Sequence, residues 1–267
     1  RTEGVFSFNN PAVYDSGYSM GLSANILRRA REDYDEERKG FKMSVGKTVL
    51  NGVRLGVTPN FEVIGIQNID GNAPSIIKDQ QGSSRKLSLE LTAMINRLNN
   101  RMVPTRGYKI TSSLEFSSLD VDMIKFVAKG TRYHTVFNFP DWRGKHVLSY
   151  GGTLGMIEAT SDEGIPIFEN FFAGGANSIR GFAFRGVGPT DVATGEQIGG
   201  KALILATTEY TVPVYSDMVR GAFFVDAGKA DTDLNDINFN NFRATLGFGF
   251  RAKVPFMGNS VVAIDFG

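Results

Sequence analysis

The sequence is dominated by a two-residue alternation of apolar and polar side chains, and residues 242–254 show it most clearly. The even-numbered positions from Phe242 to Val254 are all apolar, whereas the odd-numbered positions hold three cations, two glycines and a threonine. Successive side chains of a β-strand point to opposite faces, so this segment is predicted to be a strand between an apolar and a polar environment.

The same alternation recurs along most of the chain. We count about twelve such segments of roughly 9–12 residues, a length that lets a tilted strand cross a bilayer. Clear examples cover residues 18–26, 53–63, 86–96 and 108–116. The pattern is weakest near 41–48 and 121–138. The predicted fold class is all-β, a transmembrane antiparallel β-barrel.

The connectors between these segments alternate in length. Short connectors are expected near 11–16, 49–51, 139–145 and 255–259, with an intermediate one at 98–106. Long or charged connectors are expected near 27–40, 67–84, 159–200 and 229–241. A rim of turns opposite a rim of loops is typical of outer-membrane barrels. The strands of a soluble β-sandwich or lipocalin-like barrel also alternate apolar and polar residues. The strand length and the difference between short and long connectors argue against both folds.

Composition narrows the possible functions. Lys and Arg nearly balance Asp and Glu, giving a formal charge of +1 over 267 residues, and the charged run 28–39 mixes both signs. We therefore expect no nucleic-acid partner and interpret that run as a solvated loop. Cysteine is absent, and no Asp or Glu is spaced so that it would complete a metal site with the only histidines, His134 and His146. We interpret both as residues of the barrel rim and expect no metal, no cofactor and no catalytic residue.

The longest connector, near 159–200, contains an aromatic and glycine-rich segment that is unusual for a solvated loop. It includes Gly174, Gly175 and Gly181, which can adopt backbone conformations closed to other residues. Arg180 lies between apolar neighbours in this segment, which indicates a cation held in an enclosed place.

A buried guanidinium needs carboxylate partners. Glu209 shares a strand face with polar residues such as Thr207, and Asp226 shares the next strand's face with Arg220. Both acids should therefore point into the barrel lumen. We expect the long loop to fold into the lumen, where Arg180 pairs with Glu209 and Asp226; an exposed Arg180 is the alternative.

The loop segment resembles the signature of the BamA family of outer-membrane assembly factors. The apolar-Arg-Gly-aromatic motif is Ile179, Arg180, Gly181 and Phe182, and the runs 168–175 before it and 186–189 after it also match. The resemblance implies that acids of adjoining strands hold the loop arginine inside the barrel. It also implies about 16 strands and upstream periplasmic POTRA domains. We therefore expect residues 1–267 to be one partial C-terminal barrel domain that lacks some strands at both ends.

The resemblance further implies a multi-pass protein of the bacterial outer membrane that folds and inserts other β-barrel proteins, without covalent catalysis. Its expected partners are unfolded outer-membrane proteins, membrane lipid, accessory lipoproteins and periplasmic chaperones. Alternatives are a two-partner-type secretion pore, a TamA-like translocation and assembly factor, and a passive porin or adhesin.

Overall fold

The computed structural model describes residues 2–31, 33–141, 144–215, 218–233, 241–254 and 260–267. Within them the chain forms one sheet of twelve antiparallel strands whose spatial order is the chain order. The strands are β1 (Thr2–Asn10), β2 (Tyr18–Ala30), β3 (Asp35–Leu50), β4 (Val53–Gln67), β5 (Gly82–Asn96), β6 (Gly107–Leu119), β7 (Met123–Asn138), β8 (Lys145–Ala159), β9 (Ala202–Tyr215), β10 (Val219–Asp231), β11 (Arg243–Val254) and β12 (Ser260–Phe266).

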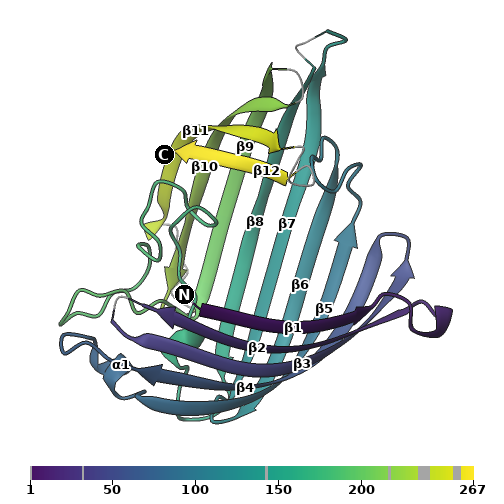
Figure 1. The fold of residues 1–267 in the computed structure, drawn as a ribbon. Helices are drawn as coiled ribbons and strands as arrows, with labels where there is room; N and C mark the ends of the chain where they lie inside the picture. The colour runs from purple at the N-terminus through teal and green to yellow at the C-terminus, as the bar shows by residue number, and fades with distance from the viewer. Residues whose placement is uncertain (1, 32, 142–143, 216–217, 234–240, 255–259) are drawn as a thin grey trace.

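The sheet is strongly curved and forms most of a barrel wall (Figure 1). The predicted number of strands is confirmed, but most strands are longer than expected, with 13 to 16 residues in nine of the twelve. Because a tilted strand needs only about 9–11 residues to cross a bilayer, many of these strands extend beyond the apolar belt.

The alternation separates the two faces of the sheet as predicted. In β11 the apolar side chains Leu246, Phe248 and Phe250 are 79%, 50% and 44% exposed on the outer face. On the opposite face of β11, Thr245 and Arg251 are paired in register with Asp226 and Arg220 of β10. This is the face that the long loop covers. An exposed apolar outer wall and a polar inner wall are what a membrane-embedded barrel requires.

The interpretation of residues 28–39 as a solvated loop is wrong. β2 runs to Ala30 and β3 begins at Asp35, so the charged run forms the tip of a hairpin. Across this hairpin Arg28 is paired in register with Glu37, and Arg29 with Glu36. Arg28 forms an ion pair with Glu37 across the two strands at 3.0 Å, whereas Glu36 pairs with Arg31 and with Arg38 of its own strand.

The connectors form two distinct rims. Short turns join β1 to β2, where the 3-10 helix η1 (Val13–Asp15) lies, and β3 to β4, while residues 97–106 join β5 to β6 at the same rim. We call this end the turn rim and the opposite end the loop rim. The loop rim contains a short helix, α1 (Ser75–Lys78), and the longest connector, residues 160–201 with η2 (Ile167–Glu169). The expected turn at 255–259 and most of the expected connector 229–241 lie outside the described residues.

The apolar core lies near the loop rim, where connectors pack against the strand ends. One cluster joins Ile64 of β4, Met123 of β7 and Ile157 of β8 to Ile167 and Phe168 of the long connector. This packing holds the connector against the inner face of the sheet. In the described part of the chain, no helix combines the length and apolar character needed to cross a membrane.

Candidate functional site

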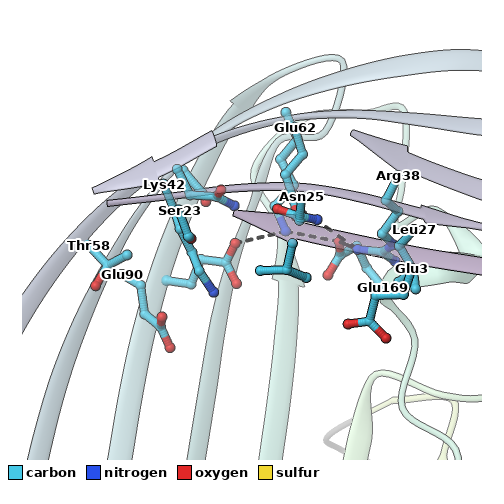
Figure 2. Close-up of a pocket in the computed structure, with 15 residues that line it drawn as sticks. Glu3, Ser23, Asn25, Leu27, Arg38, Lys42, Thr58, Glu62, Glu90 and Glu169 are labelled. Carbon is cyan, nitrogen blue, oxygen red and sulfur yellow. Dashed lines mark hydrogen bonds and ion pairs between the residues drawn. The ribbon is translucent and has the colours of Figure 1, made fainter. Parts of the chain in front are cut away.

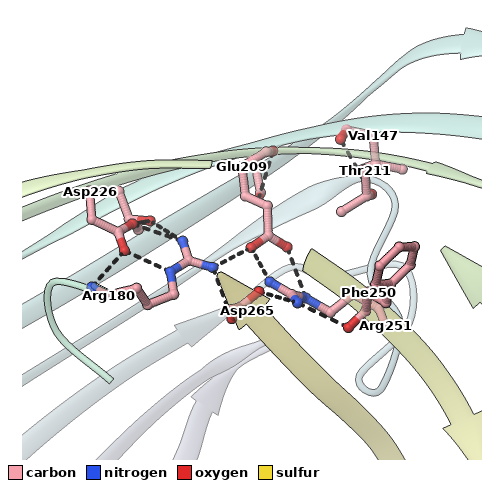
Figure 3. Close-up of polar contacts among 10 residues, drawn as sticks. Val147, Arg180, Glu209, Thr211, Asp226, Phe250, Arg251 and Asp265 are labelled. Atoms are coloured by element: carbon pink, nitrogen blue, oxygen red, sulfur yellow. Dashed lines mark hydrogen bonds and ion pairs between the residues drawn. The ribbon is translucent and has the colours of Figure 1, made fainter. Parts of the chain in front are cut away.

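Arg180 lies in an acidic pocket on the inner wall of the sheet (Figure 3). Its Nε donates to Asp226 Oδ2 at 2.6 Å and its Nη2 donates to Asp226 Oδ1 at 2.8 Å. Its Nη1 donates to Glu209 Oε2 at 2.7 Å. The guanidinium also stacks on the Phe224 ring, 3.5 Å from the ring centroid. The structure thus brings the loop arginine together with one acid of β9 and one acid of β10.

Two further charged residues complete this pocket. Arg251 of β11 donates to Glu209 at 2.5 Å and to Asp265 of β12 at 2.6 Å. Asp265 also lies 3.4 Å from Arg180 Nη1. Three carboxylates therefore surround two guanidinium groups. Burial alone would lower the pKa of Arg180, but the hydrogen bonds that it donates to Asp226 and Glu209 raise the pKa above its usual value, so the side chain stays charged.

The residues around Arg180 fix the loop backbone. Ile179 is fully buried, and Phe182 packs against the same small apolar cluster. Gly174 and Gly181 adopt φ angles of 98° and 86°, which L side chains rarely adopt. A Cβ at Gly181 would lie 2.8 Å from the carbonyl carbon of Gly267. Gly175, which follows Gly174, also has a positive φ angle, of 94°.

A second pocket, of opposite charge, holds the start of the same loop. Glu169 is 4% exposed and its Oε1 lies 2.9 Å from Lys86 Nζ of β5. Its Oε2 lies 3.0 Å from Lys125 Nζ of β7, and Arg38 of β3 lies 3.8 Å from Oε1. Arg38 also donates to the Phe168 carbonyl at 3.0 Å. The basic pocket therefore draws on three strands of the N-terminal half.

The electrostatic balance in the basic pocket favours the charged carboxylate. Burial alone would raise the pKa of Glu169, but Lys125, Lys86 and Arg38 lower it to about 2. Figure 2 shows Glu169 and Arg38 among the side chains that line a polar cavity of about 530 Å³. The loop is thus attached at Glu169 and Arg180 by charges of opposite sign.

The arrangement provides attachment and not covalent chemistry. Both pockets consist of ion pairs whose partners neutralise one another. Within the described ranges, no group of three or more His, Asp or Glu side chains could hold a metal ion. Sequence reasoning missed Glu169, Arg251 and Asp265 as site residues. Arg251 could have been found, because it is one of the three cations on the polar face of residues 242–254. Glu169 gave no comparable signal.

Comparison with known proteins identifies the family. A profile described as the Omp85 superfamily domain matches residues 1–264. The chain belongs to the Omp85 superfamily. It is 31% identical over 279 aligned residues to the outer membrane protein assembly factor BamA of Nitratidesulfovibrio vulgaris, covering 100% of this chain and 34% of that protein. The human sorting and assembly machinery component 50 homolog is 26% identical over 168 residues, covering 57% of this chain and 33% of that protein.

Two solved structures have a similar fold. BamA from Haemophilus ducreyi lacking POTRA domains 1–3 superposes with a TM-score of 0.82 at 18% identity, covering 99% of this chain and 57% of that one. CdiB from Acinetobacter baumannii gives a TM-score of 0.57 at 14% identity, covering 94% of this chain and 44% of that one. The chain spans about a third of the length of the curated relatives it matches.

Proposed function

We propose that this chain is the barrel part of an outer-membrane protein assembly factor, which folds and inserts other β-barrel proteins into the bacterial outer membrane. The observation that carries the proposal is the whole-chain similarity to a BamA protein at 31% identity. The anchored loop supports it, because Arg180 occupies its acidic pocket through the motif by which the chain resembles that family.

In this proposal residues 1–267 act as one barrel domain, and the loop near 159–200 is inserted into the lumen. Arg180, Glu209 and Asp226 hold the loop in place, and they do not contact the client protein. Ile179, Gly181 and Phe182 shape the backbone that presents the arginine, as do Gly174 and Gly175.

The activity would use the hydrogen-bonding capacity of a strand edge. An unfolded outer-membrane protein arriving from the periplasm presents unpaired backbone N–H and C=O groups, which a barrel edge satisfies by β-augmentation. Local thinning of the bilayer beside a short barrel wall would lower the barrier to insertion. Periplasmic chaperones and accessory lipoproteins would deliver the client, and no bond of the client is made or broken.

The test is an assembly assay with the full-length protein that contains this chain, reconstituted in proteoliposomes. An unfolded eight-stranded barrel is added as client, and its folding is followed by the shift in gel mobility between unheated and heated samples. The unaltered protein should accelerate folding over empty liposomes, and Arg180→Ala should remove most of that acceleration. Equal folding rates with and without the protein would refute the proposal.

The anchored loop motif also fits one second candidate, a two-partner-type secretion pore for a single exported polypeptide. The same proteoliposomes distinguish the two functions. A pore would show ion conductance and would leave the folding rate of the client barrel unchanged.

A further inference from the structure

The outer wall of the sheet carries cations at both ends of its strands, and those near the loop rim have acidic partners. Arg28 lies 3.0 Å and Lys39 lies 3.2 Å from Glu37. Arg85 lies 3.1 Å from Asp120. These cations are neutralised within the protein.

Arg132 of β7 is in a different setting. It is exposed and is paired in register with Tyr108 of β6 and Tyr150 of β8, which places it on the outer wall. Its Nε donates to His134 Nε2 at 2.9 Å, and the Tyr150 hydroxyl lies 3.3 Å from the same nitrogen. The His134 and Tyr150 rings are stacked, with centroids 5.8 Å apart.

No charge of the described residues neutralises Arg132. No described carboxylate lies within ion-pair distance of its guanidinium, and its two terminal nitrogens make no hydrogen bond to a described residue. His134 Nε2 accepts a hydrogen bond from Arg132, so we assign the ring's N–H to Nδ1. A cation on a membrane-facing wall is costly unless a counter-charge meets it there.

The surrounding aromatic side chains indicate where in the membrane this cation lies. Tyr108 and Tyr150 are exposed, and Tyr108 is the second residue of β6, at the turn rim. Tyrosine is enriched at the level of the lipid headgroups. Lys47 repeats the arrangement on β3, where its Nζ lies 3.1 Å from the Tyr18 hydroxyl and 4.3 Å from the Tyr18 ring centroid.

We propose that Arg132, oriented by His134 and Tyr150, binds the phosphate of an anionic phospholipid in the membrane leaflet at the turn rim. The two free nitrogens of a guanidinium match two phosphate oxygens, which supplies the missing counter-charge. Lys47 contacts a second headgroup as a point charge. The proposal requires only that the sheet be embedded in a bilayer, so it does not depend on the assembly activity.

The test is a lipid titration of the full-length protein in phosphatidylcholine–detergent mixed micelles, with phosphatidylglycerol added and bound lipid counted by native mass spectrometry. Arg132→Gln should weaken phosphatidylglycerol binding at least about tenfold, because it removes charge-assisted hydrogen bonds to the phosphate. Arg85→Gln is the matched control: it removes an outward cation that already has an acidic partner, and it should leave binding unchanged.

His134→Ala supplies a second variant that keeps the charge and removes its orienting contact; it should weaken binding by a smaller factor. Only ions of folded protein are counted, so a folding defect does not imitate lost affinity. Three results would overturn the proposal: unchanged binding by Arg132→Gln, equal losses in Arg132→Gln and Arg85→Gln, or no preference of the unaltered protein for phosphatidylglycerol over phosphatidylcholine.

Discussion

Replacing Glu169 by glutamine should release the start of the long loop from the inner wall. The carboxylate holds Lys86 and Lys125 at 2.9 and 3.0 Å, and glutamine keeps the shape but not the charge. Lys86 would retain Glu115 at 2.8 Å, whereas Lys125 would lose the one carboxylate that the described residues offer it. The partly buried Lys125 would be left without its counter-charge.

The magnitude follows from the pKa of Glu169. A fall from the ordinary value of 4.5 to about 2 corresponds to about 3 kcal/mol of stabilisation of the anchored loop. Breaking a buried ion pair by removing one partner costs about 3–5 kcal/mol, which is consistent. A loss of about 3 kcal/mol means roughly a hundredfold more frequent local opening.

Hydrogen exchange measures this opening directly. The Phe171 amide donates to the Gly200 carbonyl at 2.8 Å, so its exchange reports whether the loop is docked. Glu169→Gln should exchange this amide about a hundredfold faster than the unaltered protein. Glu163→Gln is the control, because it removes an exposed carboxylate from the same loop. Equal protection of Phe171 in both variants would refute the reasoning.

The lowered pKa of Glu169 also determines how the attachment of the loop depends on pH. The folded pKa of Glu169 lies below its unfolded value, so its stabilisation is fully present above about pH 4.5 and is lost as the pH falls toward 2. The difference in Phe171 protection between the unaltered protein and Glu169→Gln should therefore shrink across that window. A difference that persists at pH 2 would assign the effect to shape and not to charge.

Three further outcomes are expected. Arg180→Lys keeps the charge but loses the two-nitrogen contact with Asp226, so the loop should be about 2 kcal/mol less firmly held and more sensitive to protease. Gly174→Ala should cost about 1–3 kcal/mol in thermal unfolding, because φ is 98° and the added Cβ meets a backbone carbonyl, whereas Gly71→Ala meets open space and should be tolerated. Asp120→Asn disrupts an exposed ion pair and should leave the unfolding midpoint unchanged.

The fold could be predicted from the sequence because its main determinant is local. Alternation assigns Phe248 to the outer face and Asp226 to the inner face with no knowledge of the neighbouring strand. The error at residues 28–39 has a physical cause. Dense charge is typical of loops, but in this hairpin the charges lie opposite one another across two strands, and such pairing is visible only once the register is known.

The charged pockets show where sequence reasoning reaches its limit. Arg180 stood out because it interrupts an apolar and glycine-rich segment, and its acids lie on the next two strands along the chain. Glu169 also lies in that segment, but its partners Lys86 of β5 and Lys125 of β7 lie on strands that precede the loop and are not neighbours in the sheet. Their convergence on one carboxylate depends on the curvature of the sheet, which no local pattern encodes.

The two attachments together explain how one loop can hold the curvature of the sheet. Glu169 and Arg180 are only 11 positions apart, so the chain between them spans at most roughly 40 Å. One end contacts β3, β5 and β7, and the other contacts β9, β10 and β12. Flattening the sheet would move these strand groups apart and would have to break one attachment. Because the anchors carry opposite charges, neither can occupy the other's pocket, so the loop can dock in one orientation only.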